Sequence, residues 1–195
     1  RDRTTGLLHD TIEDTYATYE TIKGEFGIEV ADLVDGVTKI SVFENTASPN
    51  SKAENFRKLI LATSKDIRVL LVKIADRLHN MRTIKAIKKK DKRQRIAQET
   101  MEIYAPLADR MGMHRIRDEL EDLSFEILNN DARSLIQKRL DEIKLDKKDI
   151  FETLSNEINT LLFKNNIKSR IFGREKNPFS IWRKVQKKRV SLEQI

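Results

Sequence analysis

The chain has 195 residues, of which 38% are hydrophobic and 35% are charged, and its formal net charge is +7. It has no cysteine, which excludes disulfides and thiolate metal sites and leaves His, Asp and Glu as possible metal ligands. No run of about 18 apolar residues occurs and no secretion signal opens the chain, so we expect no membrane span. The positive charge favours anionic partners such as nucleotides or nucleic acid, and the lack of cysteine fits the cytoplasm.

Helical spacing of apolar residues begins near the start of the chain. A short amphipathic segment at 7–12 carries His9 and Asp10, and Thr18 is a typical N-cap for a helix that ends near Gly27. Apolar residues then share one face of a further predicted helix, namely Val30, Ala31, Leu33, Val34 and Val37.

The central part of the chain contains a predicted loop and two predicted helices. The stretch 44–50 ends in Ser, Pro and Asn and is interpreted as a loop, after which Ser51 caps a helix. The run 69–75 (VLLVKIA) is almost continuously apolar and continues without a breaker to Met81. We interpret it as a buried core helix with its polar face toward a site.

Another helix is predicted to start at Asp91, and Pro106 should bend it or end it early. A further amphipathic helix covers 116–128. From about residue 131 two long charged helices follow, separated near 145–146.

Near its end the chain changes character. The segment 168–172 (KSRIF) alternates polar and apolar residues, which predicts a strand, and Pro178 opens a basic helix through Lys188. We therefore predict an all-α fold that leads into the first strand and helix of an α/β domain. The expected domains are 1–128, a helical connector at 129–167, and 168–195.

Four polar side chains near the start of the chain point to metal chemistry. His9 lies four residues before Glu13, and Asp10 lies four residues before Asp14, so helical spacing would put each pair on one face. One imidazole and three carboxylates this close repel one another unless a cation is present, and a divalent metal is the simplest one. Asp76 is the best distant partner, because an unpaired carboxylate at the edge of an apolar helix is costly. These ligand types suit Mn²⁺, Fe²⁺ or Zn²⁺ better than Ca²⁺.

Other interpretations remain open for these residues. Acidic residues early in a helix can simply offset its dipole, and Asp76 and Arg77 could form a local ion pair. His79 lies three residues after Asp76 and could join the metal, although a supporting or core position is favoured. His114 is expected to be structural or exposed to solvent.

Five segments together match one pattern. They are HDTIEDT at 9–15, LVDGVTK at 33–39, AENFRK at 53–58, KIADRLHNMRT at 73–83, and YAPLA at 104–108 with Arg110 and Gly112. In this order they resemble the hydrolase domain of the Rel/Spo homologue (RelA/SpoT) family, whose members make and degrade the alarmones (p)ppGpp in the stringent response.

The resemblance implies a helical HD fold and a hydrolase that removes pyrophosphate from the 3′ position of (p)ppGpp, returning GDP or GTP. It implies that Mn²⁺ is bound by His9, Asp10 and Asp76, and that Glu13 and Asp14 activate water. It also implies that the nucleoside pocket is lined by Asn80 and Thr83, with Arg77 as a neighbour.

The C-terminal part resembles the opening of the same family's synthetase domain, through GREK at 173–176 and SIWRK at 180–184. The resemblance implies that Arg174 lies against the adenine of ATP and that Lys176, Ser180 and Lys184 face its phosphates. The chain ends before the family's catalytic carboxylates would appear, so we expect no pyrophosphate transfer by this chain alone.

One departure from the family pattern is expected to matter. The chain starts with Arg1 rather than Met, and the family's other metal histidine and its guanine-nucleotide-binding basic residues lie upstream of the HD pair. Neither His79 nor His114 matches that histidine. We therefore expect a fragment with an incomplete metal shell and impaired hydrolysis. Any association with the ribosome would involve regions outside it.

Three alternatives follow. The chain could be a catalytically incomplete fragment with a regulatory or nucleotide-binding role, or an HD phosphohydrolase for another nucleotide, although the synthetase-like tail argues against the latter. It could also be a basic helical nucleic-acid binder, because cations gather at 85–95 and 183–189. Solvated surfaces are the favoured interpretation of both segments, and aromatic residues make up only 6% of the chain.

Overall fold

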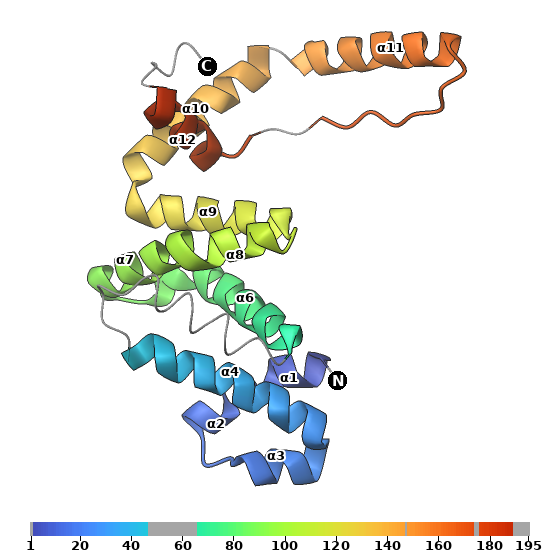
Figure 1. Cartoon of the computed structure of the whole chain (residues 1–195). Helices are drawn as coiled ribbons and strands as arrows, with labels where there is room; N and C mark the ends of the chain where they lie inside the picture. Colours follow the sequence, from blue (N-terminus) through green and yellow to red (C-terminus); the bar gives the residue numbers. More distant parts are fainter. Residues whose placement is uncertain (1, 47–65, 147, 174–175, 189–195) are drawn as a thin grey trace. The chain divides into compact units, whose positions relative to one another are not determined.

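The computed structural model describes residues 2–46, 66–146, 148–173 and 176–188 (Figure 1). Within these ranges the chain contains helices and no strand, so the all-α prediction is confirmed. The helices are α1 (Asp2–Leu8), α2 (Thr11–Asp14), α3 (Tyr19–Phe26), α4 (Ile28–Thr46), α6 (Ile67–Arg82), η1 (Ile84–Ala86), α7 (Lys90–Glu99), η2 (Thr100–Tyr104), α8 (Ala105–Arg110), α9 (His114–Leu128), α10 (Asn130–Asp146), α11 (Lys148–Lys164) and α12 (Pro178–Lys188). The chain forms two compact units, 1–120 and 121–195. No described helix is both long enough and apolar enough to cross a membrane.

The α3 helix begins and ends where its sequence predicts. The hydroxyl oxygen of Thr18 accepts a hydrogen bond from the backbone N–H of Thr21 at 3.2 Å, which satisfies one free donor at the helix start. Gly27 ends the helix with φ of 86°, a backbone conformation that glycine adopts without a Cβ clash. The turn sends the chain directly into α4.

The core of the first unit forms around α4. Its predicted apolar face is fully confirmed, because all five residues of that face are at most 3% exposed. Ile22 of α3 packs with Val30, Ala31 and Val34 in one cluster, against which Leu8 and Ile12 lie. The short helices that flank the His9–Asp10 motif are therefore attached to α4 by apolar contacts.

The α4 and α6 helices approach each other closely at Gly36. A Cβ atom at this position would lie 2.8 Å from Cγ2 of Val69, which is closer than real carbon atoms come. Glycine is thus required here for packing, although its backbone is helical. The contact fixes α6, which Asp66 caps at its N-terminus, against the helix that holds α1 and α2.

The predicted helix from Asp91 to Ala108 is present and continues to Arg110, so it does not end early at Pro106. It is divided into α7, one wide π-helical turn (η2) and α8, and Pro106 occupies the first turn of α8. Proline has no N–H to donate and its ring conflicts with the preceding turn. A widened turn before it accommodates this loss, and Tyr104 there remains fully buried.

One expectation at the end of α4 differs from the structure. The α4 helix continues to Thr46, so the first residues of the loop predicted at 44–50 are helical. The first strong breakers, Ser48 and Pro49, come only after that point. The rest of this loop, the helix predicted from Ser51 and the AENFRK motif lie outside the described residues.

The second unit contains the two predicted charged helices, α10 and α11, which meet near residue 147 as expected. The predicted basic helix from Pro178 to Lys188 is confirmed as α12. Phe125 packs edge-on against Phe179 of α12 at 5.5 Å between ring centroids and stacks on Trp182 at 6.0 Å. These rings attach α12 to the end of α9.

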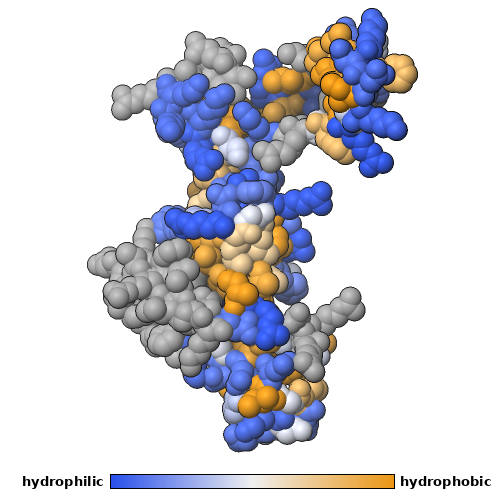
Figure 2. Space-filling view, turned by 45° about the vertical axis from the view of Figure 1, so that its right-hand side comes forward, coloured by the Kyte–Doolittle hydropathy of each residue, from blue (hydrophilic) through white to orange (hydrophobic). Residues whose placement is uncertain are grey.

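The strand predicted at 168–172 is not formed, because these residues belong to neither a helix nor a strand. A strand needs a neighbouring strand to pair its backbone groups, and none lies in the described chain. The α11 helix before it exposes an apolar stripe at helical spacing (Ile150, Leu154, Ile158 and Leu161), and apolar surface is visible in this part of Figure 2.

Candidate metal centre

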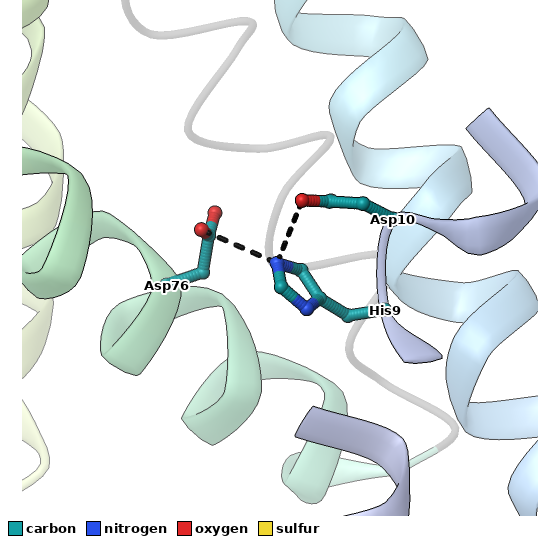
Figure 3. Close-up of side chains that lie close together, drawn as sticks. All are labelled: His9, Asp10 and Asp76. Atoms are coloured by element: carbon teal, nitrogen blue, oxygen red, sulfur yellow. Dashed lines mark ion pairs between the residues drawn. The ribbon is translucent and has the colours of Figure 1, made fainter. Parts of the chain in front are cut away.

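His9, Asp10 and Asp76 come together from two places in the sequence. His9 and Asp10 lie in the turn between α1 and α2, and both side chains extend toward Asp76 on α6 (Figure 3). One ligand atom from each residue lies within 4.8 Å of the others, which is a separation that a single metal ion can bridge. The grouping predicted from the sequence is therefore present in the structure.

The orientation of His9 leaves one ring nitrogen for a cation. Its Nδ1 lies 2.8 Å from the carbonyl oxygen of Gly6, which can only accept a hydrogen bond, so Nδ1 carries the hydrogen. In the neutral ring Nε2 then has a lone pair. This atom is buried and has no hydrogen-bond partner in the described chain, yet it faces carboxylate oxygens of Asp10 at 3.0 Å and Asp76 at 3.3 Å. Three electron-rich atoms that face one another fit a site that binds a positive ion.

Two further side chains of α6 contact the carboxylate of Asp76, which is only 12% exposed. The amide of Asn80 donates a hydrogen bond to Oδ1 at 2.9 Å, and the ammonium of Lys73 lies 3.8 Å from Oδ2. Lys73 is itself only 5% exposed. Our sequence interpretation missed Lys73, although it is the one charged residue in the apolar run VLLVKIA and stands three residues before Asp76.

The electrostatics of Asp10 show how crowded the cluster is. Burial raises the pKa of its carboxyl group, and His9 offsets part of that rise. The charges of Asp76 and Asp14 raise the pKa further, and Lys73 lowers it. The protein alone therefore disfavours the ionised form of Asp10, and a bound cation would favour it.

The local backbone differs from the predicted continuous helix at 7–12. Helix α1 ends at Leu8, and α2 starts at Thr11, whose hydroxyl donates to the carbonyl oxygen of Leu8 at 2.6 Å. The carbonyl oxygen of Asp10 accepts from the N–H of Asp14 at 2.8 Å, so the spacing argument holds for this pair. His9 and Glu13 do not share a helix, because His9 lies before Asp10, the N-cap residue of α2.

Glu13 and Asp14 both lie on α2 and are exposed. Asp14 is close enough to Asp10 to act on its pKa. The two carboxylates thus lie on the short helix that follows the metal cluster, where solvent and a bound ligand could reach them.

The residues predicted to line the nucleoside pocket lie on α6 or directly after it, and they differ in exposure. Asn80 and Thr83 are exposed, and the hydroxyl of Thr83 donates to the carbonyl oxygen of His79 at the end of the helix. Arg77 is 8% exposed, forms an ion pair with Glu99 at 3.0 Å and stacks its guanidinium on the ring of Tyr104 at 4.2 Å. Through these two contacts Arg77 links α6 to α7 and η2.

The other two histidines lie outside the cluster. His79 is exposed on α6 and shares no ligand group with Asp76 in the described chain. His114 is exposed at the start of α9, with its Nδ1 3.3 Å from Asp109, which agrees with the expected solvent-facing position.

The C-terminal candidates are only partly described. Ser180 and Lys184 lie one turn apart on α12, and Lys176 is exposed just before this helix. The side chain of Asn177 caps the helix by accepting from the N–H of Ser180 at 2.7 Å. Arg174 lies outside the described residues.

Comparison with known proteins identifies the family. A family model described as an HD domain matches residues 2–114. The chain is 48% identical over 189 residues, 97% of its length, to a GTP pyrophosphokinase Rsh from Brucella melitensis. It is 46% identical over 180 residues (92%) to a guanosine-3′,5′-bis(diphosphate) 3′-pyrophosphohydrolase from Haemophilus influenzae. It is 45% identical over 179 residues (92%) to the bifunctional (p)ppGpp synthase/hydrolase SpoT of Escherichia coli K12.

The chain spans about a quarter of the length of these three relatives. The match to the Brucella relative covers 189 residues and therefore runs through both compact units. The chain belongs to the HD-domain family and, within it, to the Rel/Spo homologue family.

Proposed function

We propose that this chain is the hydrolase part of an enzyme that removes the 3′-pyrophosphate of (p)ppGpp and returns GDP or GTP, as part of stringent-response alarmone metabolism. The observation that carries this proposal is the buried Nε2 of His9 facing the carboxylates of Asp10 and Asp76. The hydrolase names of the Haemophilus and Escherichia relatives support the substrate. Together with the lack of cysteine, a nucleotide substrate favours a cytoplasmic enzyme.

We propose Mn²⁺ as the metal, with His9, Asp10 and Asp76 as ligands from this chain. One nitrogen and two carboxylate ligands match the preferences of Mn²⁺ and of neighbouring divalent metals. When bound, such a metal supplies Lewis-acid activation of water and of a phosphoryl oxygen. The hydrogen bond from His9 to the carbonyl oxygen of Gly6 keeps the ring in the tautomer that can bind it.

Glu13 and Asp14 are the proposed general base groups. One of these carboxylates accepts a proton from the attacking water, whose oxygen bonds to the phosphorus attached to the 3′ oxygen of the ribose. The bond from that phosphorus to the 3′ oxygen breaks, a proton returns to this oxygen, and pyrophosphate leaves. The exposed position of both carboxylates on α2 allows exchange of protons with solvent.

The nucleoside is proposed to lie along the end of α6. Asn80 and Thr83 are exposed there, one and two turns beyond Asp76, and can offer an amide and a hydroxyl to a sugar or base. Arg77 is included in this proposal because its contacts with Glu99 and Tyr104 hold α6 in position.

For the complete protein we further propose ATP binding at the C-terminal segment, with Arg174 against the adenine and Lys176, Ser180 and Lys184 facing the phosphates. The shared face of Ser180 and Lys184 on α12 supports this arrangement, as do the relatives named as pyrophosphokinases. Loss of ATP affinity in a Lys184→Met variant would support it, and unchanged affinity would contradict it.

A substrate panel tests the hydrolase proposal. The protein expressed from its complete reading frame would be incubated with Mn²⁺ and either ppGpp, pppGpp, GTP, ATP or dGTP, and the products separated by ion-exchange chromatography. We expect pyrophosphate with GDP from ppGpp, pyrophosphate with GTP from pppGpp, and no reaction of the other three. Hydrolysis of GTP, ATP or dGTP instead would identify a phosphohydrolase for another nucleotide.

A further inference from the structure

Both carboxylate oxygens of Asp76 have a partner from the same helix. Asn80, four residues later, donates to Oδ1 at 2.9 Å, and Lys73, three residues earlier, approaches Oδ2 at 3.8 Å. Spacings of three and four residues bring side chains together on one face of a helix, so α6 itself sets the environment of this carboxylate.

Asn80 determines which way the carboxylate faces. The oxygen that accepts from its amide is Oδ1, the same atom that lies 3.3 Å from Nε2 of His9. A carboxylate oxygen has two acceptor directions, so one can accept from Asn80 while the other remains directed at the space beside His9. Without the amide, the carboxylate keeps only the contact with Lys73, rotates more easily and loses more orientational entropy on binding a cation. Such supporting partners typically change metal affinity by about 10- to 100-fold.

Lys73 acts on the same carboxylate through charge. Its side chain is only 6% exposed, and its positive charge acts on Asp10 as well as on Asp76. A cation held beside two carboxylates offsets part of their negative charge before any metal arrives. It also repels a divalent ion that binds to them, and this repulsion is strong where water is largely excluded.

We propose that Asn80 and Lys73 are positioning residues that set the metal affinity of this centre in opposite directions. Asn80 raises affinity by fixing the Asp76 carboxylate, and Lys73 lowers it as a resident positive charge. Lys73 also stabilises the metal-free protein, because Asp76 would otherwise be a mostly buried carboxylate next to Asp10 without a cation. The inference rests on the proposed metal centre.

The test is a titration with Mn²⁺ alone, without nucleotide, followed by the electron paramagnetic resonance signal of free Mn²⁺. It uses the protein from its complete reading frame as wild type, Asn80→Ala, Lys73→Met and His79→Ala. His79 is an exposed neighbour on the same helix and serves as the matched control. Circular dichroism and thermal unfolding without metal establish that each variant is folded. If Lys73→Met does not fold, Lys73→Gln removes the charge with a smaller change in polarity.

We expect Asn80→Ala to weaken Mn²⁺ binding about tenfold or more and the neutral Lys73 variant to tighten it about tenfold or more, with His79→Ala unchanged. We also expect the Lys73 variant to unfold at a lower temperature than wild type only while metal is absent. Equal affinities for all four proteins would overturn the inference and leave the metal centre standing. Weaker binding by both variants would overturn the opposing roles. Absence of Mn²⁺ binding by wild type would overturn the inference and the proposed metal together.

Discussion

Nε2 of His9 and Oδ1 of Asp76 face each other at 3.3 Å, although the two residues are far apart in the sequence and only Asp76 lies in a helix. The contact depends on the packing of α6 against α4 at Gly36 and of α1 and α2 against the α3–α4 pair. Changes to the cluster, to its neighbours and to this packing therefore have distinct consequences.

Removing a ligand should strongly weaken metal binding. Asp76→Ala removes one of the three metal-binding side chains of the cluster. We therefore expect the affinity for Mn²⁺ to fall by at least about 100-fold, which exceeds the usual effect of a supporting residue. Calorimetric titration with Mn²⁺ measures this change. An Asp91→Ala variant, which removes an exposed carboxylate from the start of α7, is the control and should bind as wild type does.

Glu13 and Asp14 should affect catalysis more than metal binding. Glu13→Ala and Asp14→Ala each remove a proposed general base, so we expect kcat for pyrophosphate release to fall about 100-fold or more. Mn²⁺ affinity should change much less than in Asp76→Ala. Glu25→Ala on the exposed side of α3 is the matched control. A loss of Mn²⁺ binding equal to that of Asp76→Ala would show that these carboxylates are ligands instead.

Gly36 should tolerate no side chain. Gly36→Ala places a Cβ atom 2.8 Å from Val69, so the free energy of unfolding should fall by about 1–3 kcal/mol. Gly24→Ala on α3 meets no atom within 4 Å and should be neutral or stabilise by up to about 1 kcal/mol, because alanine favours the helix. Chemical denaturation measures both. Equal effects of the two substitutions would contradict the close packing of α4 on α6.

Replacing Arg77 should lower the stability of the protein more than it weakens substrate binding. Arg77→Met removes the ion pair with Glu99 and the stacking on Tyr104. We expect a loss of roughly 2 kcal/mol, below the value for fully buried pairs because the Glu99 side chain is 29% exposed. Arg95→Met, an exposed residue of α7, should change little. If Arg77→Met left stability intact but raised KM for ppGpp, direct substrate contact would be its role.

The Asp66 cap should make the stability of the protein depend on pH. Its side chain caps α6 and accepts from the backbone N–H of Arg68 at 2.9 Å, so Asp66→Ala should cost about 1 kcal/mol at neutral pH. Hydrogen bonds from Arg68 lower the pKa of this carboxyl group in the folded protein. The stabilisation is therefore present above the unfolded pKa of about 4 and is lost as pH falls through the lower folded value. Unfolding of wild type and variant at pH 7 and at about pH 3 should show the difference shrink; a constant difference would contradict this.

Much of the fold followed from local signals in the sequence. The Thr18 cap, the Gly27 stop, the buried face of α4 and the start of α12 at Pro178 were all predicted, because caps, breakers and helical spacing act over a few residues. The strand at 168–172 was predicted from alternation alone and did not form, since strand pairing depends on a partner elsewhere in the chain.

The grouping of His9, Asp10 and Asp76 was predicted, but its geometry was not. Residue types and the KIADRLHNMRT motif identified Asp76 as the partner of His9 and Asp10, and the structure brings the three together. The turn that contains His9 and Asp10 and the inward position of Lys73 depend on how the helices pack on one another, which spacing along one helix does not contain. Arg77 likewise faces the core through its neighbours on α7 and η2.

The most direct measurement is the rate of pyrophosphate release from ppGpp as Mn²⁺ is titrated, for wild type and Asp76→Ala expressed from the complete reading frame. The proposed metal centre predicts a rate that rises to saturation with Mn²⁺ in wild type, is abolished by a chelator, and is absent in Asp76→Ala at the same Mn²⁺ concentrations. Release that proceeds without metal, or at equal rates in the two proteins, would contradict it.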